Sequence, residues 1–251
     1  MPSRTLKPST ILTLVAPLKN AAAKRSSGTV ANPVGRPTGR NSDDTRTTIL
    51  DVTEGLFAEG GYDGTSIRDI ATHCNVQAAV IGYHFGTKTE LFDAVVGRRA
   101  VIVNAARTQA LTAELAAHKG RPLPIEVLVE TYVSPLLDAT SHGDAGWRNF
   151  ASLMGRLANS PRGTEMINQH YKDVAEQFMN EFRRSLPTVP DGRLVDGFLY
   201  MVSAMLFVCA DTRRWEAMVK TKSKKTRDAP AVLSDLVPFV AGGFKALLNE
   251  K

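Results

Sequence analysis

Residues 61–88 decide the fold of this chain, and they read GYDGTSIRDIATHCNVQAAVIGYHFGTK. Ser66 and Asp69 have the spacing of a capping box, in which each side chain accepts a hydrogen bond from the other residue's backbone N–H. A helix therefore begins after Ser66. Asn75 ends it, because asparagine tolerates the left-handed backbone conformation that a tight turn requires.

Two further helices follow that turn. The first is short and runs from about Gln77 to Tyr83. The second is long, begins at a capping box formed by Thr87 and Glu90, and continues to about residue 115. Upstream, a helix that begins near residue 42 carries apolar residues at helical spacing on one face: Ile49, Val52, Leu56 and Phe57. Three short helices with a tight turn between the second and third form a helix-turn-helix, whose last helix can lie in the major groove of DNA.

The rest of the chain is also predicted to be helical, because no alternating strand pattern with hairpin turns occurs. Further helices are expected at about 125–139, 147–158, 164–186, 194–219 and 231–248. Ser160 and Pro161 can start one of them as N-cap and first residue, and Asp191 can cap the next. We expect a loop at 220–227, and a delayed helix start or a kink at Pro238. The predicted fold class is therefore all-α.

The composition is that of a globular protein with one basic segment. The chain has 251 residues, is 43% hydrophobic and 22% charged, and contains 19 Gly and 13 Pro, which excludes collagen-like and low-complexity classes. Its net charge is +6, yet residues 1–40 hold seven basic residues and no acid, so residues 41–251 carry a net charge of −1. Residues 1–41 are predicted to form a flexible basic tail.

No pattern typical of an enzyme or a metal site occurs in the sequence. The five histidines lack the spacing of metal ligands, and no nucleophile–base pair or glycine-rich phosphate loop is recognisable. Cys74 and Cys209 are far apart and are expected to be free thiols in a reducing cytoplasm. No stretch approaches the roughly 20 apolar residues of a membrane span. We therefore expect a cytoplasmic protein with no membrane association, no catalytic residues, no cofactor and no metal.

The segment described first resembles the N-terminal domain of TetR-family transcriptional regulators. The resemblance lies in the strings GYDGTSIRDIA, NV and IGYHFGTK, above all in Tyr83-His84-Phe85 followed by Lys88, and it covers about residues 46–96. It implies a DNA-binding domain at 42–90 and a ligand-binding and dimerisation domain at 91–251. It further implies a homodimeric repressor that binds a pseudo-palindromic operator in double-stranded DNA and is released by a small-molecule effector of unknown identity.

The resemblance also implies which residues contact DNA. Thr65 and Ser66 match phosphate-contacting positions at the start of a helix, where backbone N–H groups and the helix dipole attract phosphate. Lys88 matches a further phosphate contact, and Arg36 and Arg40 resemble a minor-groove arm. The residues that would face the groove are Gln77, Ala78, Val80 and Gly82. The full predicted set is Arg36, Arg40, Arg46, Thr65, Ser66, Gln77, Ala78, Val80, Gly82, Tyr83, His84 and Lys88.

Two features favour a different function. The first is Gly82, which stands where the family commonly has an aromatic or polar side chain. Gln77 also departs from the usual Ser or Thr and can read adenine through two hydrogen bonds, which bears on the operator sequence rather than on the domain. The second feature is the charge. Residues 41–90 hold three basic residues and eight acids, a net charge of −5, whereas DNA affinity rises with the number of phosphates neutralised. The alternative function is an all-α small-molecule sensor or interaction protein without sequence-specific DNA binding.

The C-terminal half offers candidates for a ligand pocket and a dimer interface. The amphipathic helix at about 147–158 and an apolar stripe on a later helix can each be core, pocket wall or interface, and the sequence leaves these alternatives open. The candidate pocket residues are Trp147, Arg148, Phe150, Met154 and Met201. Arg148 or Arg156 would meet an anionic or polar ligand. The resemblance implies that the helices at about 194–219 and 231–248 form a four-helix dimer interface.

Overall fold

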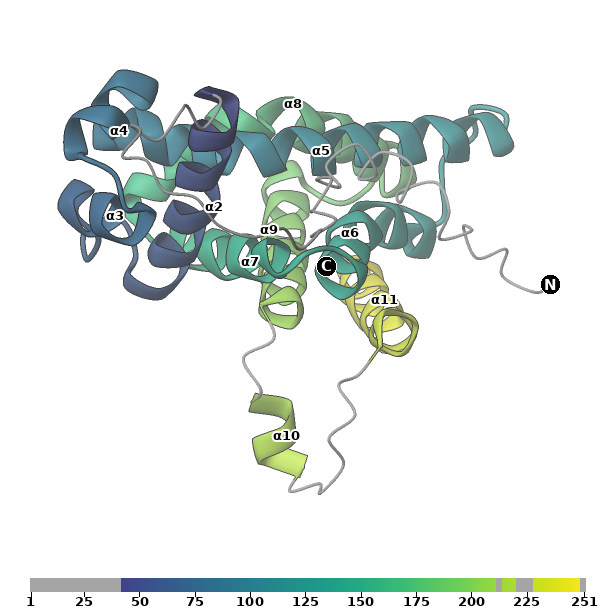
Figure 1. The fold of residues 1–251 in the computed structure, drawn as a ribbon. Helices are drawn as coiled ribbons and strands as arrows, with labels where there is room; N and C mark the ends of the chain where they lie inside the picture. Colours follow the sequence, from purple (N-terminus) through teal and green to yellow (C-terminus); the bar gives the residue numbers. More distant parts are fainter. Residues whose placement is uncertain (1–41, 211–213, 220–227, 249–251) are drawn as a thin grey trace, which may run out of the picture.

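The computed structural model describes residues 42–210, 214–219 and 228–248. The predicted tail with Arg36 and Arg40, and the predicted loop at 220–227, lie outside these residues. Every regular element within the described ranges is a helix (Figure 1), so the all-α prediction is confirmed. The helices are α2 (Ser42–Gly60), α3 (Ile67–Cys74), α4 (Ala78–Phe85), α5 (Lys88–Ala117), α6 (Ile125–His142), α7 (Ala145–Ala158), α8 (Pro161–Ser185), α9 (Asp191–Cys209), α10 (Arg214–Val219) and α11 (Ala229–Ala246).

The N-terminal part of the described chain is a helix-turn-helix (Figure 1). α2 packs against α3, α3 against α4, and the start of α5 closes the unit. Its centre is an aromatic cluster in which Phe92 lies edge-on to Phe57 and Tyr62, with ring centroids 4.7 and 5.0 Å apart. Ile70 of α3 and Ile81 of α4 are fully buried. These contacts fix the position of α4 relative to α2 and α5.

The predicted caps around α3 and α5 are confirmed. Ser66 and Asp69 form a capping box at the start of α3, and Thr87 and Glu90 form another at the start of α5. Asn75 ends α3 in the left-handed conformation, with φ 53° and ψ 47°. The turn between α3 and α4 is therefore built by the local residue that the sequence singled out.

α5 joins the helix-turn-helix to the C-terminal bundle (Figure 1). It has 30 residues and contacts α2 as well as α6 and α8. α7 packs against α2 on one side and against α9 on the other. Buried residues of α2 to α9 and of α11 form one continuous core. The helix-turn-helix is thus joined to the bundle through α5 and α7.

Two predictions for α9 are wrong. The single helix expected at 194–219 is two helices, because α9 ends at Cys209 and α10 is a separate turn of helix. The apolar run ends there, and Asp211 and Thr212, which follow in the sequence, have low helix propensity. Asp191 is the first residue of α9 rather than its cap, and its carboxylate accepts a 2.6 Å hydrogen bond from Arg183 Nε. Pro190, with its fixed φ, occupies the N-cap position.

Of the predictions that involve prolines, the one for Ser160 and Pro161 is confirmed, whereas for Pro238 a delayed helix start is wrong and the alternative, a kink, stays a prediction. Ser160 caps α8 and Pro161 is its first residue, as predicted. Pro238 does not delay the start of α11, which begins at Ala229 and contains Pro238 in its interior. The start of α11 is instead set by Asp228, whose side chain accepts a 3.0 Å hydrogen bond from the backbone N–H of Ala231.

α9 is more apolar than expected from the prediction that no stretch approaches the length of a membrane span. It is the one described helix whose length and hydropathy would suffice to cross a membrane, although helices in soluble cores also satisfy this test. About a third of its apolar stretch, 33%, is buried in the protein. The exposed remainder includes Val195, Leu199 and Tyr200. α9 therefore presents an apolar face outward.

Candidate nucleic-acid interface

The N-terminus of α3 places Ser66 at the surface and Thr65 inside. The Ser66 hydroxyl and backbone N–H both donate to the Asp69 carboxylate, over 2.6 and 2.9 Å, and hold the pKa of Asp69 below its usual value. Thr65 is 4% exposed, and its hydroxyl donates to the carbonyls of Leu56 and Gly61. The Thr65 hydroxyl is thus engaged within the protein. Ser66 is exposed at this end of α3, but its hydroxyl and its N–H are both engaged with Asp69.

α4 has one buried face and one exposed face. Ile81 and Phe85 are buried, whereas Gln77 and Ala78 are exposed and Val80 is half-buried against the core. Gln77 occupies the N-cap position but makes no side-chain cap hydrogen bond. Its amide is therefore not engaged in capping, and the exposed face at the start of α4 carries only one long side chain.

The outer surface of α4 ends in an exposed tyrosine. Tyr83 is 84% exposed, and its only ring contact among the described residues is an edge-on one with His84 at 5.3 Å. Gly82, beside it, is exposed, and a Cβ at this position would meet nothing within 4 Å. Packing therefore does not require glycine here. A large aromatic side chain held in solvent has no role in the fold of the described chain.

The starts of α2 and α5 bring two of the predicted cations close to α4. Lys88 is half-buried, with Nζ 4.2 Å from the centre of the Tyr62 ring. The Tyr62 hydroxyl in turn lies 2.8 Å from Thr89 Oγ1. Arg46 of α2 lies with its guanidinium carbon 5.0 Å from the centre of the Phe85 ring, at the end of α4. Lys88 and Arg46 thus flank the C-terminal end of α4.

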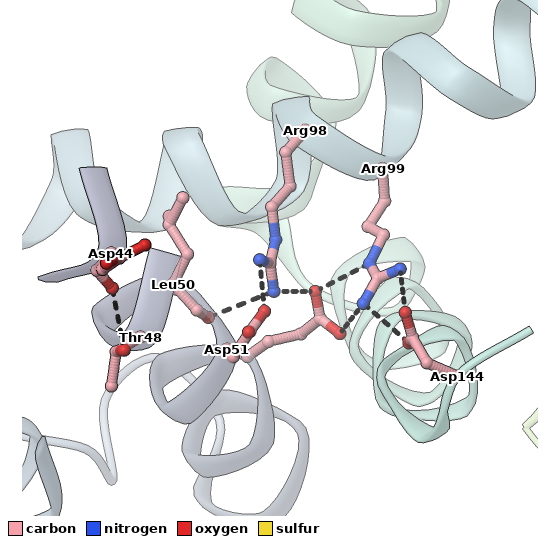
Figure 2. Close-up of polar contacts among 8 residues, drawn as sticks. Asp44, Thr48, Leu50, Asp51, Arg98, Arg99 and Asp144 are labelled. Carbon is pink, nitrogen blue, oxygen red and sulfur yellow. Dashed lines mark hydrogen bonds and ion pairs between the residues drawn. The ribbon is translucent and has the colours of Figure 1, made fainter. Parts of the chain in front are cut away.

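The acidic balance of the helix-turn-helix is partly neutralised by α5. Figure 2 shows Arg98 and Arg99 side by side, reaching from α5 toward α2 and α7. Arg98 binds Asp51 Oδ1 through Nη1 and Glu54 Oε2 through Nη2, each over 2.6 Å. Two of the eight acids counted in residues 41–90 therefore have cationic partners just beyond residue 90. These two acids are neutralised in the folded protein, so they oppose DNA binding less than the net charge of residues 41–90 suggests.

Glu54 is at the centre of a buried charge network between the two parts of the chain. We call this network the interdomain ion cluster; it consists of Asp51, Glu54, Arg98, Arg99 and Asp144. The Glu54 side chain is 1% exposed and also accepts from Arg99 Nε and Nη2, over 3.1 and 3.2 Å. Arg99 continues to Asp144, at the start of α7, over 2.9 Å (Figure 2). The cluster thus links α2, α5 and α7.

The charged forms are stabilised within the interdomain ion cluster despite its burial. Burial alone would lower the pKa of Arg99, but Glu54 and Asp144 outweigh it and raise that pKa. Burial would raise the pKa of Asp144, yet hydrogen bonds and charge from Arg99 hold it below its usual value. Gly146 leaves room for the cluster, since a Cβ there would lie 2.2 Å from Arg99 Nη2 and 2.4 Å from Glu54 Oε1.

The structure separates the predicted pocket residues into buried and exposed ones. Trp147, Phe150 and Met154 of α7, together with Met201 of α9, are buried. The Trp147 ring lies against the Arg99 guanidinium, 4.6 Å from its carbon, and the indole N–H has no hydrogen-bond partner among the described residues.

Neither arginine predicted to meet a ligand lies among these buried residues. Arg148 is exposed and donates to the Thr140 carbonyl over 3.4 Å. Arg156 is also exposed and donates to the Glu59 carbonyl of α2 over 3.1 Å. Arg156 therefore joins α7 to the end of α2, as a further contact between the helix-turn-helix and the bundle.

The interdomain ion cluster is not among the predicted features, although the sequence contains a signal for it. Glu54 lies in register with Leu50 and Phe57 on the apolar stripe of α2, and Arg99 lies in register with Val96 and Val103 on that of α5. A charged residue in an apolar stripe predicts a buried charge, which needs a partner of opposite sign. The identity of that partner depends on how α2, α5 and α7 pack together.

Comparison with known proteins agrees with this architecture. The family model described as "Bacterial regulatory proteins, tetR family" matches residues 49–95, which cover most of α2 through the start of α5. The model described as "Tetracyclin repressor-like, C-terminal domain" matches residues 130–243, from α6 into α11. The two matches thus fall on the two parts of the fold.

Two curated relatives each match less than a quarter of this chain. An HTH-type transcriptional repressor of Mycobacterium tuberculosis is 45% identical over 60 residues, which are 24% of this chain and 31% of that protein. The negative transcriptional regulator IcaR of the biofilm operon icaADBC in Staphylococcus aureus is 42% identical over 45 residues, 18% of this chain and 24% of that protein. The match therefore spans less than a third of the length of these relatives.

Solved structures share the whole architecture at low sequence identity. The hemolysin II transcriptional regulator HlyIIR has a TM-score of 0.53 at 19% identity, covering 81% of this chain and 98% of its own. The ketosteroid transcriptional regulator KstR2 of Mycobacterium tuberculosis has a TM-score of 0.54 at 18% identity, covering 83% and 96%. At this identity the likeness shows a common fold. The two family models show that this chain belongs to the TetR family of transcriptional regulators, which are not enzymes.

Proposed function

We propose that the chain is a cytoplasmic repressor that binds a pseudo-palindromic operator as a homodimer and leaves it when a small-molecule effector binds. The observation that carries DNA docking is the exposed face of α4. It combines small residues, which let the backbone approach base edges, with the 84% exposed ring of Tyr83. A ring with no packing role in the described chain fits a contact with another molecule.

Groups that can bind phosphate lie on both sides of α4, which supports contacts with the DNA backbone there. Ser66 at the start of α3 and Lys88 at the start of α5 both lie at helix N-termini, where N–H groups and the helix dipole favour phosphate. Tyr83 and His84 add a phenol and an imidazole donor to the end of α4. α4 would then lie in the major groove with Gln77, Ala78 and Gly82 toward the bases.

The apolar face of α9 and α11 supports a homodimer. Several large apolar side chains of these helices are exposed: Val195, Leu199, Tyr200, Phe207 and Phe239. Two such faces related by a two-fold axis would bury one another and form a four-helix interface. The same interface would account for the apolar surface of α9 without a membrane.

The buried residues of α7 and α9 support an effector pocket in the bundle. Trp147, Phe150, Met154 and Met201 offer apolar surface, and the unpartnered indole N–H of Trp147 offers a donor. The interdomain ion cluster begins three residues before Trp147, at Asp144. A ligand that displaced the start of α7 would therefore act on Glu54 of α2, and so on the spacing of the two recognition helices.

DNA docking is tested by titrating the full chain, at several salt concentrations, against labelled DNA from its own promoter region. Tyr83→Ala and Lys88→Ala are expected to weaken binding, and Lys88→Ala also to lower the slope of log affinity against log salt by about 1. Lys172→Ala, an exposed lysine of α8, is the matched control and should leave affinity unchanged. Unchanged affinity in both α4–α5 variants would refute the assignment of this surface.

A parallel experiment addresses the tail and the alternative function. Deleting residues 1–40 removes seven basic residues, including Arg36 and Arg40. The slope of log DNA affinity against log salt should therefore become less steep than in the full chain. The net charge of −5 in residues 41–90 favours the alternative, a small-molecule sensor without sequence-specific DNA binding. That function predicts no difference in affinity between promoter DNA and shuffled DNA of the same composition.

A further inference from the structure

One buried cation in the C-terminal bundle has no acidic partner among the residues that the structure describes. Arg107, in the middle of α5, is 1% exposed and is among the largest fully buried side chains of the described chain. Its Nε donates to the Tyr132 carbonyl over 2.9 Å, and its Nη2 lies 3.3 Å from Met205 Sδ. Its guanidinium carbon lies 3.9 Å from the centre of the Tyr132 ring. These groups are a neutral carbonyl, a weakly accepting thioether and an aromatic face.

The contrast with Arg99 shows what is missing. Both arginines are buried on the same helix, but Arg99 binds the carboxylates of Glu54 and Asp144, whereas Arg107 makes no ion pair within the described ranges. The half-buried acids of α6, Glu130 and Asp138, do not reach it, and burial raises the pKa of both carboxyls. A buried charge without a counter-charge is strongly unfavourable, so proteins rarely keep one for packing alone.

Two phenols lie in the electrostatic range of the Arg107 guanidinium. Tyr171 of α8 is buried, which raises the pKa of its hydroxyl against the opposing effect of the Arg107 charge. The phenol is therefore neutral and keeps its proton. Both side chains are more than nine-tenths buried. Two buried phenols thus lie near the guanidinium where α5, α6 and α8 meet.

We propose that Arg107 is the recognition group for an anionic effector, namely a carboxylate with an apolar body. The proposal rests on the ligand response proposed above and names the chemical class of the ligand. A guanidinium binds a carboxylate through two parallel N–H donors, and two phenol hydroxyls can donate to the same oxygens. The Tyr132 ring also lies edge-on to Phe178 and Phe198, at 5.0 and 5.1 Å, so aromatic surface surrounds the anion site.

The competing explanation for the burial of Arg107 is that it only stabilises the packing of the helices it contacts. Its contacts join α5 to α6 through Tyr132 and to α9 through Met205. In that case an apolar side chain of similar length should replace it without loss of any ligand response. Arg107→Met is that replacement, and Arg107→Lys keeps the charge but loses the two-pronged donor geometry.

The test measures ligand binding by thermal shift and by tryptophan fluorescence on the full chain. The probes are benzoate and octanoate, with benzamide and octanamide as neutral controls of the same shape. Wild-type protein is expected to be stabilised by at least one carboxylate and by neither amide. Arg107→Met should abolish that shift, Arg107→Lys should weaken the affinity about tenfold, and Arg121→Met, at an exposed arginine, should leave it unchanged. Circular dichroism establishes that each variant is folded.

The outcomes separate this proposal from the proposed function. If neither carboxylate stabilises the wild type, or if Arg107→Met binds a carboxylate as tightly as the wild type, the anion site is refuted, whatever the protein does on DNA. The promoter-binding titration is repeated with the binding carboxylate present. Binding that depends on Arg107 without any change in DNA affinity would uphold the anion site and refute effector-controlled release.

Discussion

Replacing Glu54 by glutamine tests whether the interdomain ion cluster holds the helix-turn-helix on the bundle. Glutamine keeps the size of the side chain and removes its charge. The Glu54 carboxylate accepts three hydrogen bonds, one from Arg98 and two from Arg99. Removing one partner of a buried ion pair typically costs about 3–5 kcal/mol, because the other charge is left buried and uncompensated.

We expect a value at the lower end of that range, about 3 kcal/mol, because each arginine keeps one carboxylate. Arg98 keeps Asp51, and Arg99 keeps Asp144. With a urea m-value near the upper end of the usual range, about 3 kcal/mol per molar, the unfolding midpoint should fall by about 1 M. Asp51→Asn is the control, since the Asp51 side chain is 59% exposed and its pair should contribute less than about 1 kcal/mol.

The assay is urea unfolding of the full chain, followed by circular dichroism at neutral pH. A double-mutant cycle with Arg99→Gln then isolates the pair, for which we expect a coupling of at least about 1 kcal/mol. Equal losses for Glu54→Gln and Asp51→Asn, or a coupling near zero, would refute the view that the buried carboxylate joins the two parts of the chain.

Four further substitutions address the interdomain ion cluster, α4 and the proposed dimer face. Gly146→Ala would place a Cβ 2.2 Å from Arg99 Nη2 and should lower the free energy of unfolding by about 1–3 kcal/mol. At Gly82 a Cβ meets nothing within 4 Å, so Gly82→Ala should raise the free energy of unfolding by about 1 kcal/mol. Thermal unfolding of both variants measures the two effects. Because Arg99 holds the pKa of Asp144 below 3.8 against the effect of burial, that carboxyl contributes stability that is complete above about pH 4 and is lost as the pH falls through the lowered value. In Asp144→Asn, the free energy of unfolding should therefore depend less steeply on pH below pH 4, and its dependence on pH above pH 5 should be unchanged. Leu199→Asp, on the exposed face of α9, should convert a dimer to a monomer in light scattering without unfolding it, and a wild type that is already monomeric would refute the proposed interface.

The parts of the fold that the sequence predicts well are those decided by neighbouring residues. A capping box needs only residues three apart, so Ser66 with Asp69 and Thr87 with Glu90 could be recognised before any packing was known. The left-handed turn at Asn75 is local in the same sense. The position of α4, which the proposed function requires, follows from these local signals together with the family resemblance.

The parts that the sequence predicts poorly depend on contacts between distant residues. Glu54 and Arg99 are 45 positions apart, and nothing in either neighbourhood indicates that they meet. Arg148 and Arg156 were reasonable candidates for a ligand contact because they lie on an amphipathic helix. They are exposed nevertheless, because the buried face of α7 is set by Trp147, Phe150 and Met154. Helical register can show that a charge is buried, but only the packing of helices shows what it meets.

Arg99 and Arg107 lie on one stiff helix, and this arrangement gives the bundle a physical route to the DNA-binding surface. Eight residues separate them, or about 12 Å along the axis of α5. Arg99 is held by Glu54 of α2 and by Asp144 at the N-cap of α7, whereas Arg107 contacts α6 and α9 and has no counter-charge within the described ranges. An anion that bound Arg107 and displaced α5 would change the geometry at Glu54, and hence the position of α2. Such coupling is reciprocal: if the anion weakens operator binding by some factor, operator DNA must weaken binding of the anion by the same factor.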